Sequence, residues 1–371
     1  MRTANGSVIS TRADGSRAEI RDAQRGLDIR YGLNGNRRVM TERIDHSRVF
    51  AERGGGGYVQ HPYQFHGQEL ARRTYLEHGH ESVRFYERYA YRGMYLEVYA
   101  PAHFYPVGFY GWVHAPWAAP VHYAWEWRRS VWYGRYAYYF TPYPVYTNAS
   151  SWLTDYLIAS SLQAAYAAQV RAQLAAGVNA PGLSPEVKEA IAEEVREEVQ
   201  QETAAAQANA ANSQGLPDNG GVGTLLGDGS SHVFVSGADI DALGPGGDEC
   251  IVGPGDVVEV RAAPAYGAQS VGATVLASKG GRDCAVNSNI RIALADLQEM
   301  QNYMRETVDQ AMADLQSRQG TSNLPAAPPG VQGAPVNAGF VTGAPPPDAD
   351  AAAQIAAQAS AADQAEKQGP E

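Results

Sequence analysis

The sequence predicts an α+β protein whose strands and helices occupy separate stretches of the chain. Three observations support this class. Turn dipeptides recur at near-regular spacing up to about residue 101 and separate short runs of alternating apolar and charged residues. Ala- and Glu-rich stretches with helical spacing follow between residues 151 and 212. A second group of short apolar runs, between residues 224 and 295, leads into a further helical stretch.

Residues 1–94 are predicted to form an array of antiparallel β-hairpins. Asn-Gly and Asp-Gly turns between alternating runs are the strongest local signal for a hairpin. The clearest extended runs are residues 18–21, 27–31, 37–40 and 47–50. Each run alternates apolar and charged side chains, so each strand should turn one face toward water and the core of this array should be thin.

Residues 95–150 form an aromatic, proline-broken segment that we expect to pack on the hairpin array. Residues 58–156 hold 29 of the chain's 36 Phe, Trp and Tyr, including all six Trp. Proline removes a backbone donor and restricts the residue before it, so long strands are not expected among these rings. Tyr and Trp combine an apolar body with a polar group, which predicts a partly exposed aromatic surface. The candidate ligand-binding rings are Tyr110, Trp112, Trp117, Trp125, Trp127 and Trp132.

Residues 151–212 are predicted to form a helical connector. Ser151 can cap a helix that runs to about residue 175, and Ser184 with Pro185 opens a second helix in the expected order. A narrow apolar stripe at every fourth position consists of Val187, Ile191, Val195 and Val199. Seven Glu between residues 186 and 202 flank this stripe and are expected to form a solvated face. The Gly-rich residues 213–223 are predicted to be a linker.

Residues 224–318 are predicted to form a small β domain with a C-terminal helix. Five short strands in this stretch indicate a small barrel or sandwich. The helix should run from about Leu294 to Gln316, where apolar residues recur at spacings of three and four. Residues 319–371 are rich in Pro, Ala, Gly and Gln without periodicity, which predicts a disordered tail.

The chain has two cysteines, Cys250 and Cys284, and both lie in the predicted β domain. An even count within one small domain indicates a disulfide, which persists in oxidising compartments. Two buried free thiols in a cytosolic protein are the alternative. No apolar run reaches the 18 or so residues that span a bilayer. The first ten residues lack the apolar core of a signal peptide, so we expect an export segment upstream of Met1 and an extracytoplasmic location, in the periplasm or at the cell surface.

Charge does not indicate nucleic-acid binding. The formal net charge is -11, and residues 1–150 carry 19 Arg against 13 Asp and Glu, a surplus of +6. A nucleic-acid-binding domain usually shows a clustered basic face instead, and no RNA-recognition motif occurs here.

Sequence motifs for catalysis are weak. His78, His80 and Glu81 lie on one turn and could bind Zn or Cu, but no third ligand stands at a fixed spacing. A cluster of carboxylates in the β domain lacks the spacing of a calcium loop: Asp239, Asp241, Asp248, Glu249 and Asp256. No nucleophile elbow or phosphate-binding loop occurs. We therefore expect neither an enzyme nor a bound cofactor, and a metal-dependent enzyme is a minor alternative.

Several stretches of the chain are similar to stretches of a known group of proteins. They are Phe109-Tyr110-Gly111-Trp112, Pro116-Trp117-Ala118-Ala119-Pro120-Val121, residues 140–146, 152–156, 184–188, 275–280 and 296–301. These stretches resemble an uncharacterised group of bacterial exported, Tyr/Trp-rich envelope-type proteins. The resemblance implies bacterial origin and export, and it carries over no activity and no catalytic residue.

Taken together, the sequence predicts a non-enzymatic structural or adhesive protein of the bacterial cell envelope. The sharper alternative is a glycan- or peptidoglycan-binding protein that uses the aromatic segment, because flat rings with polar edges can stack on sugars. Expected partners are an envelope polysaccharide or another protein. The sequence does not indicate an oligomeric state.

Overall fold

The structure is a computed structural model that describes residues 7–53, 56–77, 79–172, 181–211 and 221–368. The chain forms two compact units, Met1–Arg88 with Phe340–Glu371 and Tyr89–Gly339. The predicted α+β class is confirmed, because separate antiparallel sheets and long helices make up the described residues. The first unit therefore combines two segments that differ in composition and lie far apart in the sequence. Most of the predicted linker, residues 213–223, lies outside the described residues.

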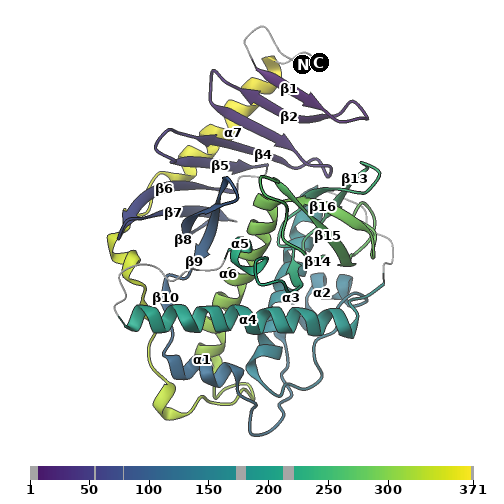
Figure 1. Cartoon of the computed structure of the whole chain (residues 1–371). Helices are drawn as coiled ribbons and strands as arrows, with labels where there is room; N and C mark the ends of the chain where they lie inside the picture. The colour runs from purple at the N-terminus through teal and green to yellow at the C-terminus, as the bar shows by residue number, and fades with distance from the viewer. Residues whose placement is uncertain (1–6, 54–55, 78, 173–180, 212–220, 369–371) are drawn as a thin grey trace. The chain divides into compact units, whose positions relative to one another are not determined.

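The predicted hairpins are confirmed as a nine-stranded antiparallel sheet whose strands follow chain order (Figure 1). The strands are β1 (Val8–Thr11), β2 (Arg17–Asp22), β3 (Leu27–Tyr31), β4 (Arg37–Glu42), β5 (Arg48–Glu52), β6 (Gly57–Phe65), β7 (Gln68–Glu77), β8 (His80–Tyr91) and β9 (Met94–Ala100). In two turns the side chains of Asp14 and Asn34 each accept a hydrogen bond from the backbone N–H two residues further on. The glycines that follow, Gly15 and Gly35, have φ angles of +85° and +81°, a region that glycine enters without a steric cost.

The C-terminal tail is not disordered throughout, so that prediction is wrong for residues 351–368. They form helix α7 (Ala351–Gln368), the yellow helix along the purple strands in Figure 1. One end of α7 packs in a buried cluster of Val49, Ala51, Val59, Ala351 and Ile355. The other end packs in a cluster of Ile9, Ile20, Leu27, Ile29, Val39, Ala362 and Ala365. The buried side of α7 is mostly alanine, so its amphipathic pattern is too weak to be seen in the sequence, although the sheet face it covers is strongly apolar.

Asp348 attaches the segment before α7 to the same strands. Its carboxylate lies 2.9 Å from Nη2 of the buried Arg72 and 2.7 Å from Nε2 of His61. Phe340 also packs edge-on against Phe65 and Phe85. Residues 340–348 therefore attach to β6, β7 and β8 through an ion pair with Arg72, a contact with His61 and apolar packing.

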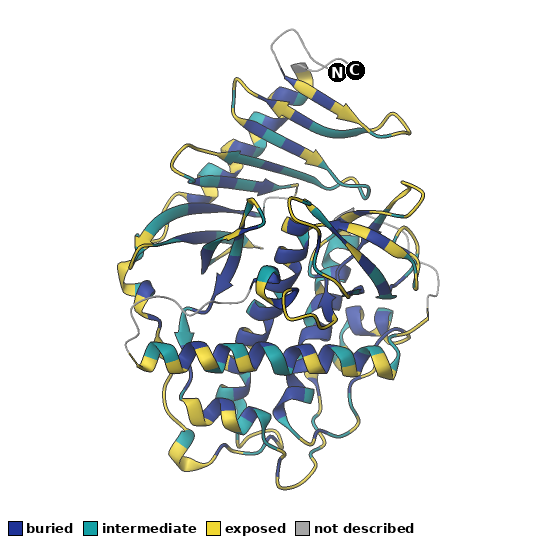
Figure 2. Ribbon diagram, in the orientation of Figure 1, coloured by how far each residue is buried: buried dark blue, intermediate teal, exposed yellow. Residues whose placement is uncertain are grey.

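Helices form the core of the second unit. They are α1 (Val107–His114), η1 (Glu126–Arg129), α2 (Val131–Tyr136), α3 (Ala149–Ala172), α4 (Pro185–Ala210), α5 (Val222–Leu225) and α6 (Leu294–Arg318). The predicted start of α4 is confirmed, because the Ser184 hydroxyl accepts a hydrogen bond from the Val187 N–H. The predicted cap at Ser151 is wrong, because α3 already begins at Ala149 and the Asn148 side chain accepts the hydrogen bond of the Ser151 N–H. α3, α4 and α6 contact one another, and Figure 2 shows mostly buried residues along α6. These helices are therefore a packed core, not a connector between domains.

The predicted small β domain is a single antiparallel sheet and not a closed barrel. Its strands are β11 (His232–Val235), β12 (Ile240–Leu243), β13 (Glu249–Val252), β14 (Val257–Val260), β15 (Ser270–Ala277) and β16 (Asn289–Ala293). Their order in the sheet is β11-β14-β15-β16-β12-β13, which leaves β11 and β13 at the two edges. Because β11 pairs with β14 and not with its neighbour in the chain, spacing in the sequence could not show this order.

Shorter elements complete the described chain. β10 (His103–Phe104) pairs with β17 (Val336–Asn337), and η2 (Pro329–Val331) and η3 (Gly339–Gly343) lie close to β17 in the sequence.

The packing of α7 predicts the effect of Ile355→Ala. Ile355 is 1% exposed, so its truncation should destabilise the first unit by about 2–5 kcal/mol. Hydrogen exchange of the β4–β6 amides measures this loss directly. Ser360→Ala, an exposed change on the same helix, is the control and should leave the exchange rates unchanged. Equal protection in the two variants would show that α7 does not stabilise the sheet.

Candidate functional site

The rings that the sequence singled out are largely core residues. Tyr110 is 0% exposed, and Trp117, Trp125 and Trp132 are 7–8% exposed. Trp112 and Trp127 are half-buried. The expected partly exposed surface is therefore wrong for four of the six candidates. The prolines do break the strand pattern, but they let the segment fold into short helices whose rings pack inward.

The tryptophans contact one another in a nearly continuous series. Trp125 stacks on Trp152 with ring centroids 4.9 Å apart and on Trp127 at 5.2 Å. Trp127 in turn contacts Trp132 at 5.3 Å. Such aromatic pairs contribute about 0.5–1.5 kcal/mol each beyond the area they bury. Trp152 lies on α3, so the series joins the irregular segment to that helix.

Asp155 of α3 organises the polar groups inside this aromatic cluster. Its carboxylate is 0% exposed and accepts hydrogen bonds from the Tyr143 N–H at 2.6 Å and the Tyr146 hydroxyl at 2.5 Å. The Trp125 indole N–H donates to the same Tyr146 hydroxyl at 2.7 Å. Burial raises the pKa of Asp155, and the charge of Lys188 opposes this shift.

Lys188 of α4 supplies the opposite charge. Its Nζ lies 2.6 Å from Asp155, donates to the Thr141 carbonyl at 2.9 Å and lies 3.6 Å from the centroid of the Tyr143 ring. Burial lowers the pKa of Lys188 and Asp155 raises it again, so each charge is stable only while its partner is present. The pair connects α3, α4 and the aromatic segment.

A second polar cluster lies between α4 and α6. It shows that the predicted solvated Glu face of residues 186–202 is wrong in part. The Glu residues of α4 do not all face solvent, because Glu194, Glu198 and Glu202 are only 4–5% exposed. These three Glu recur every four residues, as the valines of the Val195–Val199 stripe do. The sequence therefore does contain a pattern that places them next to the apolar face of the helix. Charged residues in a helix are nearly always exposed unless paired, and this rule led to the wrong expectation.

Partners for these carboxyls come from several elements. The Tyr110 hydroxyl donates to Glu202 at 2.6 Å, and the Tyr99 hydroxyl donates to Asp309 at 2.8 Å. Arg305 of α6 lies 3.3 Å from Glu198.

The carboxyls of this cluster hold their protons unusually tightly. Burial raises the pKa of Glu198 to about 8, although Arg305 opposes the shift. Burial and the nearby Asp309 likewise raise the pKa of Glu202 to about 8. The cluster can therefore take up protons near neutral pH. Because Glu198, Glu202 and Asp309 are at most 6% exposed, the cluster is enclosed and does not offer its carboxyls to a substrate.

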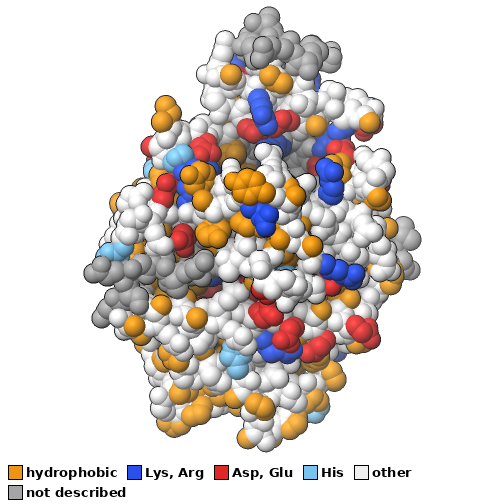
Figure 3. Space-filling model, in the orientation of Figure 1, with side chains coloured by type: hydrophobic (Ala, Val, Ile, Leu, Met, Phe, Trp, Pro, Cys, Tyr) orange, Lys and Arg blue, Asp and Glu red, His pale blue; other side chains and the backbone are white. Residues whose placement is uncertain are grey.

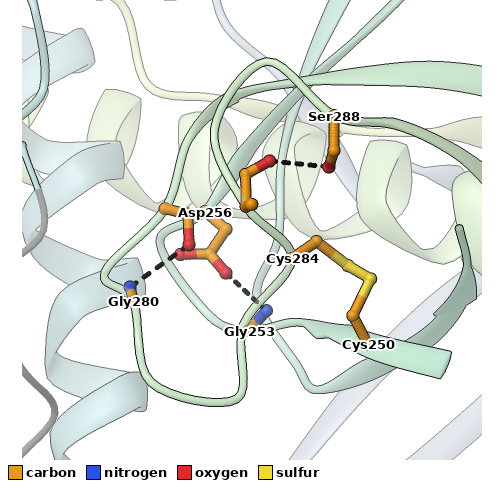
Figure 4. Close-up of a disulfide and its surroundings, with 8 residues drawn as sticks. Cys250, Gly253, Asp256, Gly280, Cys284 and Ser288 are labelled. Atoms are coloured by element: carbon orange, nitrogen blue, oxygen red, sulfur yellow. Dashed lines mark hydrogen bonds between the residues drawn. A yellow bond between two sulfur atoms is a disulfide. The ribbon is translucent and has the colours of Figure 1, made fainter. Parts of the chain in front are cut away.

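The predicted disulfide between Cys250 and Cys284 is present and links β13 to the loop before β16 (Figure 4). Close to it, Asp256 accepts a hydrogen bond from the Gly253 N–H at 2.8 Å and pairs with the buried Lys279. Burial alone would lower the pKa of Lys279, but Asp256 and Asp283 raise it, so the lysine keeps its charge. Asp256 is therefore a structural residue, and Asp241, Asp248 and Glu249 are exposed.

The structure describes only two of the three weak metal candidates from the sequence. His80 and Glu81 are exposed at the start of β8, and His78 lies outside the described residues. Within the described part of the chain, possible ligand atoms of Glu194, Glu197 and His232 lie within 4.8 Å of one another. The sequence did not single out this group, because His232 is distant from the two Glu in the chain.

Charges on the visible face of the molecule are intermixed. Figure 3 shows acidic and basic side chains together over α4, where Arg196 pairs with Glu189 at 2.9 Å and with Glu193 at 2.5 Å. Among the described helices, none is long and apolar enough to cross a bilayer.

Comparisons with protein-family models, curated proteins and solved structures gave no match for this chain.

Lys188→Met tests the buried ion pair. The substitution keeps the side-chain length but leaves Asp155 buried without a counter-charge, so it should destabilise the second unit by about 3–5 kcal/mol. Urea unfolding followed by tryptophan fluorescence measures the loss. Lys367→Met, at an exposed position of α7, should cost almost nothing. The double variant Asp155→Asn/Lys188→Met should regain part of the loss, and a single variant as stable as the control would contradict the role of the pair.

Glu202→Gln tests the buried carboxyls through pH. The pKa of Glu202 is raised from 4.5 to about 8 in the folded state, so folding takes up a proton between these values. The resulting stability is complete below about pH 4.5 and is lost as the pH rises to about 8, by up to about 1.4 kcal/mol per pH unit. Glutamine still accepts the Tyr110 hydrogen bond but does not titrate, so the variant should lose less stability across this range.

The readout for Glu202→Gln is the unfolding free energy at several pH values between 5 and 9. Glu189→Gln, an exposed change on α4, controls for the loss of one carboxylate. If Glu202→Gln and wild type lose stability in parallel, Glu202 does not bind a proton in the folded state.

Proposed function

We propose that this chain is a non-enzymatic structural or adhesive protein of the bacterial cell envelope that works in an extracytoplasmic compartment. The observation that carries the proposal is the disulfide between Cys250 and Cys284, since such bonds persist in oxidising surroundings. The resemblance of the aromatic stretches to exported envelope-type proteins supports the same compartment.

The use of the aromatic and ionisable groups supports a structural role. Trp125 and Trp132 are buried against other rings, and Asp155 with Lys188 is occupied in holding that cluster together. The raised-pKa carboxyls of α4 are enclosed. Side chains that a catalyst would present to a substrate are here used for packing.

Glycan binding through the aromatic segment has weaker support. Sugar recognition needs ring faces that a ligand can reach, and among the six candidates Trp112 and Trp127 are the half-buried ones. Trp127 already stacks on Trp125, so most of its surface is in use.

Thiol trapping in the native host tests the compartment. Protein that is alkylated during lysis without reductant should show no free thiol, and it should show two after unfolding and reduction. The disulfide closes a loop of 34 residues, so reduction should destabilise the protein by about 3–4 kcal/mol on a chain-entropy model. Two free thiols in unreduced native protein would overturn the extracytoplasmic proposal.

Envelope fractionation separates the structural proposal from glycan binding. The native protein should co-fractionate with the envelope. Retention on insoluble peptidoglycan should not depend on Trp112 or Trp127. Tyr266→Ala, at a ring that is 85% exposed in the β sheet region, is the matched control. Retention that is lost in Trp112→Ala but kept in Tyr266→Ala would favour the glycan alternative.

A further inference from the structure

Glu194, Glu197 and His232 form a cluster where α4 contacts β11, inside the second unit. The two Glu are three residues apart, so their side chains lie on the same side of the helix. The side chain of His232 is 1% exposed and that of Glu194 is 5% exposed, whereas that of Glu197 is 39% exposed. The cluster is therefore buried at its imidazole and open toward solvent at one carboxylate.

The contacts of His232 Nδ1 in this cluster are long for hydrogen bonds. Nδ1 of His232 lies 3.4 Å from Glu194 Oε1 and 3.6 Å from Glu197 Oε2. Both exceed the 2.7–3.2 Å that N–H···O hydrogen bonds prefer. Around a tetrahedral Zn²⁺ with bonds of about 2.0–2.1 Å, neighbouring ligand atoms lie about 3.3–3.5 Å apart. All three ligand atoms lie within 4.8 Å of one another, so side-chain movements could bring them to these distances around one Zn²⁺.

The remaining groups around the cluster orient two of the ligands. Nε2 of His232 lies 3.2 Å from the Asp228 carboxylate, so Nδ1 is the ring nitrogen that faces Glu194 and Glu197. Metal-binding histidines usually donate their second N–H to a carboxylate in this way. The Val233 N–H donates to Glu194 Oε2 at 3.1 Å, so Oε1 of the same carboxylate points toward His232.

We propose that Glu194, Glu197 and His232 bind one Zn²⁺ ion, with the fourth coordination position open to water. One imidazole and two carboxylates are a donor set that zinc accepts, whereas Ca²⁺ and Mg²⁺ prefer oxygen ligands throughout. The divalent charge also offsets the carboxylates that surround the buried imidazole. The partly exposed Glu197 gives the ion a path into the site.

The competing arrangement is a metal-free ion pair. Burial would lower the pKa of His232, but hydrogen bonds and charges from Glu194 and Asp228 raise it to about 9. A protonated His232 would then balance the carboxylates alone. Zinc titration distinguishes the two arrangements, because an ion pair alone binds no metal.

The experiment is calorimetric titration of untagged, chelator-treated protein with ZnCl₂. The expected result is one Zn²⁺ per chain with micromolar or tighter affinity, and no comparable binding of CaCl₂. Substitution with Co²⁺ should give the intense visible absorption of a four-coordinate ion. The proposal would be overturned if no heat of binding were measured up to about 100 μM zinc. That limit corresponds to a binding free energy of roughly −5.5 kcal/mol.

Variants assign the ligands. His232→Gln and Glu197→Gln should each abolish stoichiometric binding, and Asp228→Asn should weaken it by about 10–100-fold because Asp228 only orients the imidazole. Glu193→Gln, on the exposed side of α4, and His80→Ala, at the exposed sequence candidate, should bind zinc as wild type does. Wild-type affinity in Glu197→Gln would place the metal elsewhere and refute the site, and this variant is informative even if His232→Gln fails to fold, because Glu197 is partly exposed.

Discussion

The aromatic core of the second unit depends on the buried charge pair of Asp155 and Lys188. Asp155 and Lys188 come from different helices, and each is surrounded by rings of the proline-broken segment. That segment contains only short helices after β10, so the contacts of its Tyr and Trp side chains do much to fix its conformation. Because a buried carboxylate tolerates few arrangements, the pair selects one packing of the rings from many of similar apolar area.

The first unit depends on a different interaction, the cover that α7 gives to one face of its sheet. A long meander of short strands has two faces, and its charged face is stable in water without cover. Its apolar face needs a partner, and the chain supplies α7 for this purpose. Alanine along α7 lets the helix axis approach the sheet closely, and Arg72 with Asp348 fixes the point at which the chain returns.

Local patterns in the sequence predicted the elements well. The hairpin strands, the start of α4 at Ser184, the helix from Leu294 and the disulfide all follow from short-range rules such as turn chemistry, capping and cysteine pairing. Three features could not be predicted in this way, because each depends on residues that are distant in the chain. The alanine face of α7 has meaning only beside the sheet, and the burial of Glu198 and Glu202 depends on Arg305 and Tyr110. The proximity of His232 to Glu194 likewise depends on β11 lying beside α4.

The position of α7 also affects the order in which the molecule can form. The Tyr31 hydroxyl bonds to Glu366, a partner 335 residues further along the chain. The strands made first therefore stay without their cover until residues 351–368 have been synthesised. During that interval their apolar face is open to chaperones and to other copies of the chain. A chain that ends before α7 would keep this exposed face, which would let cellular proteases distinguish chains that lack α7 from those that contain it.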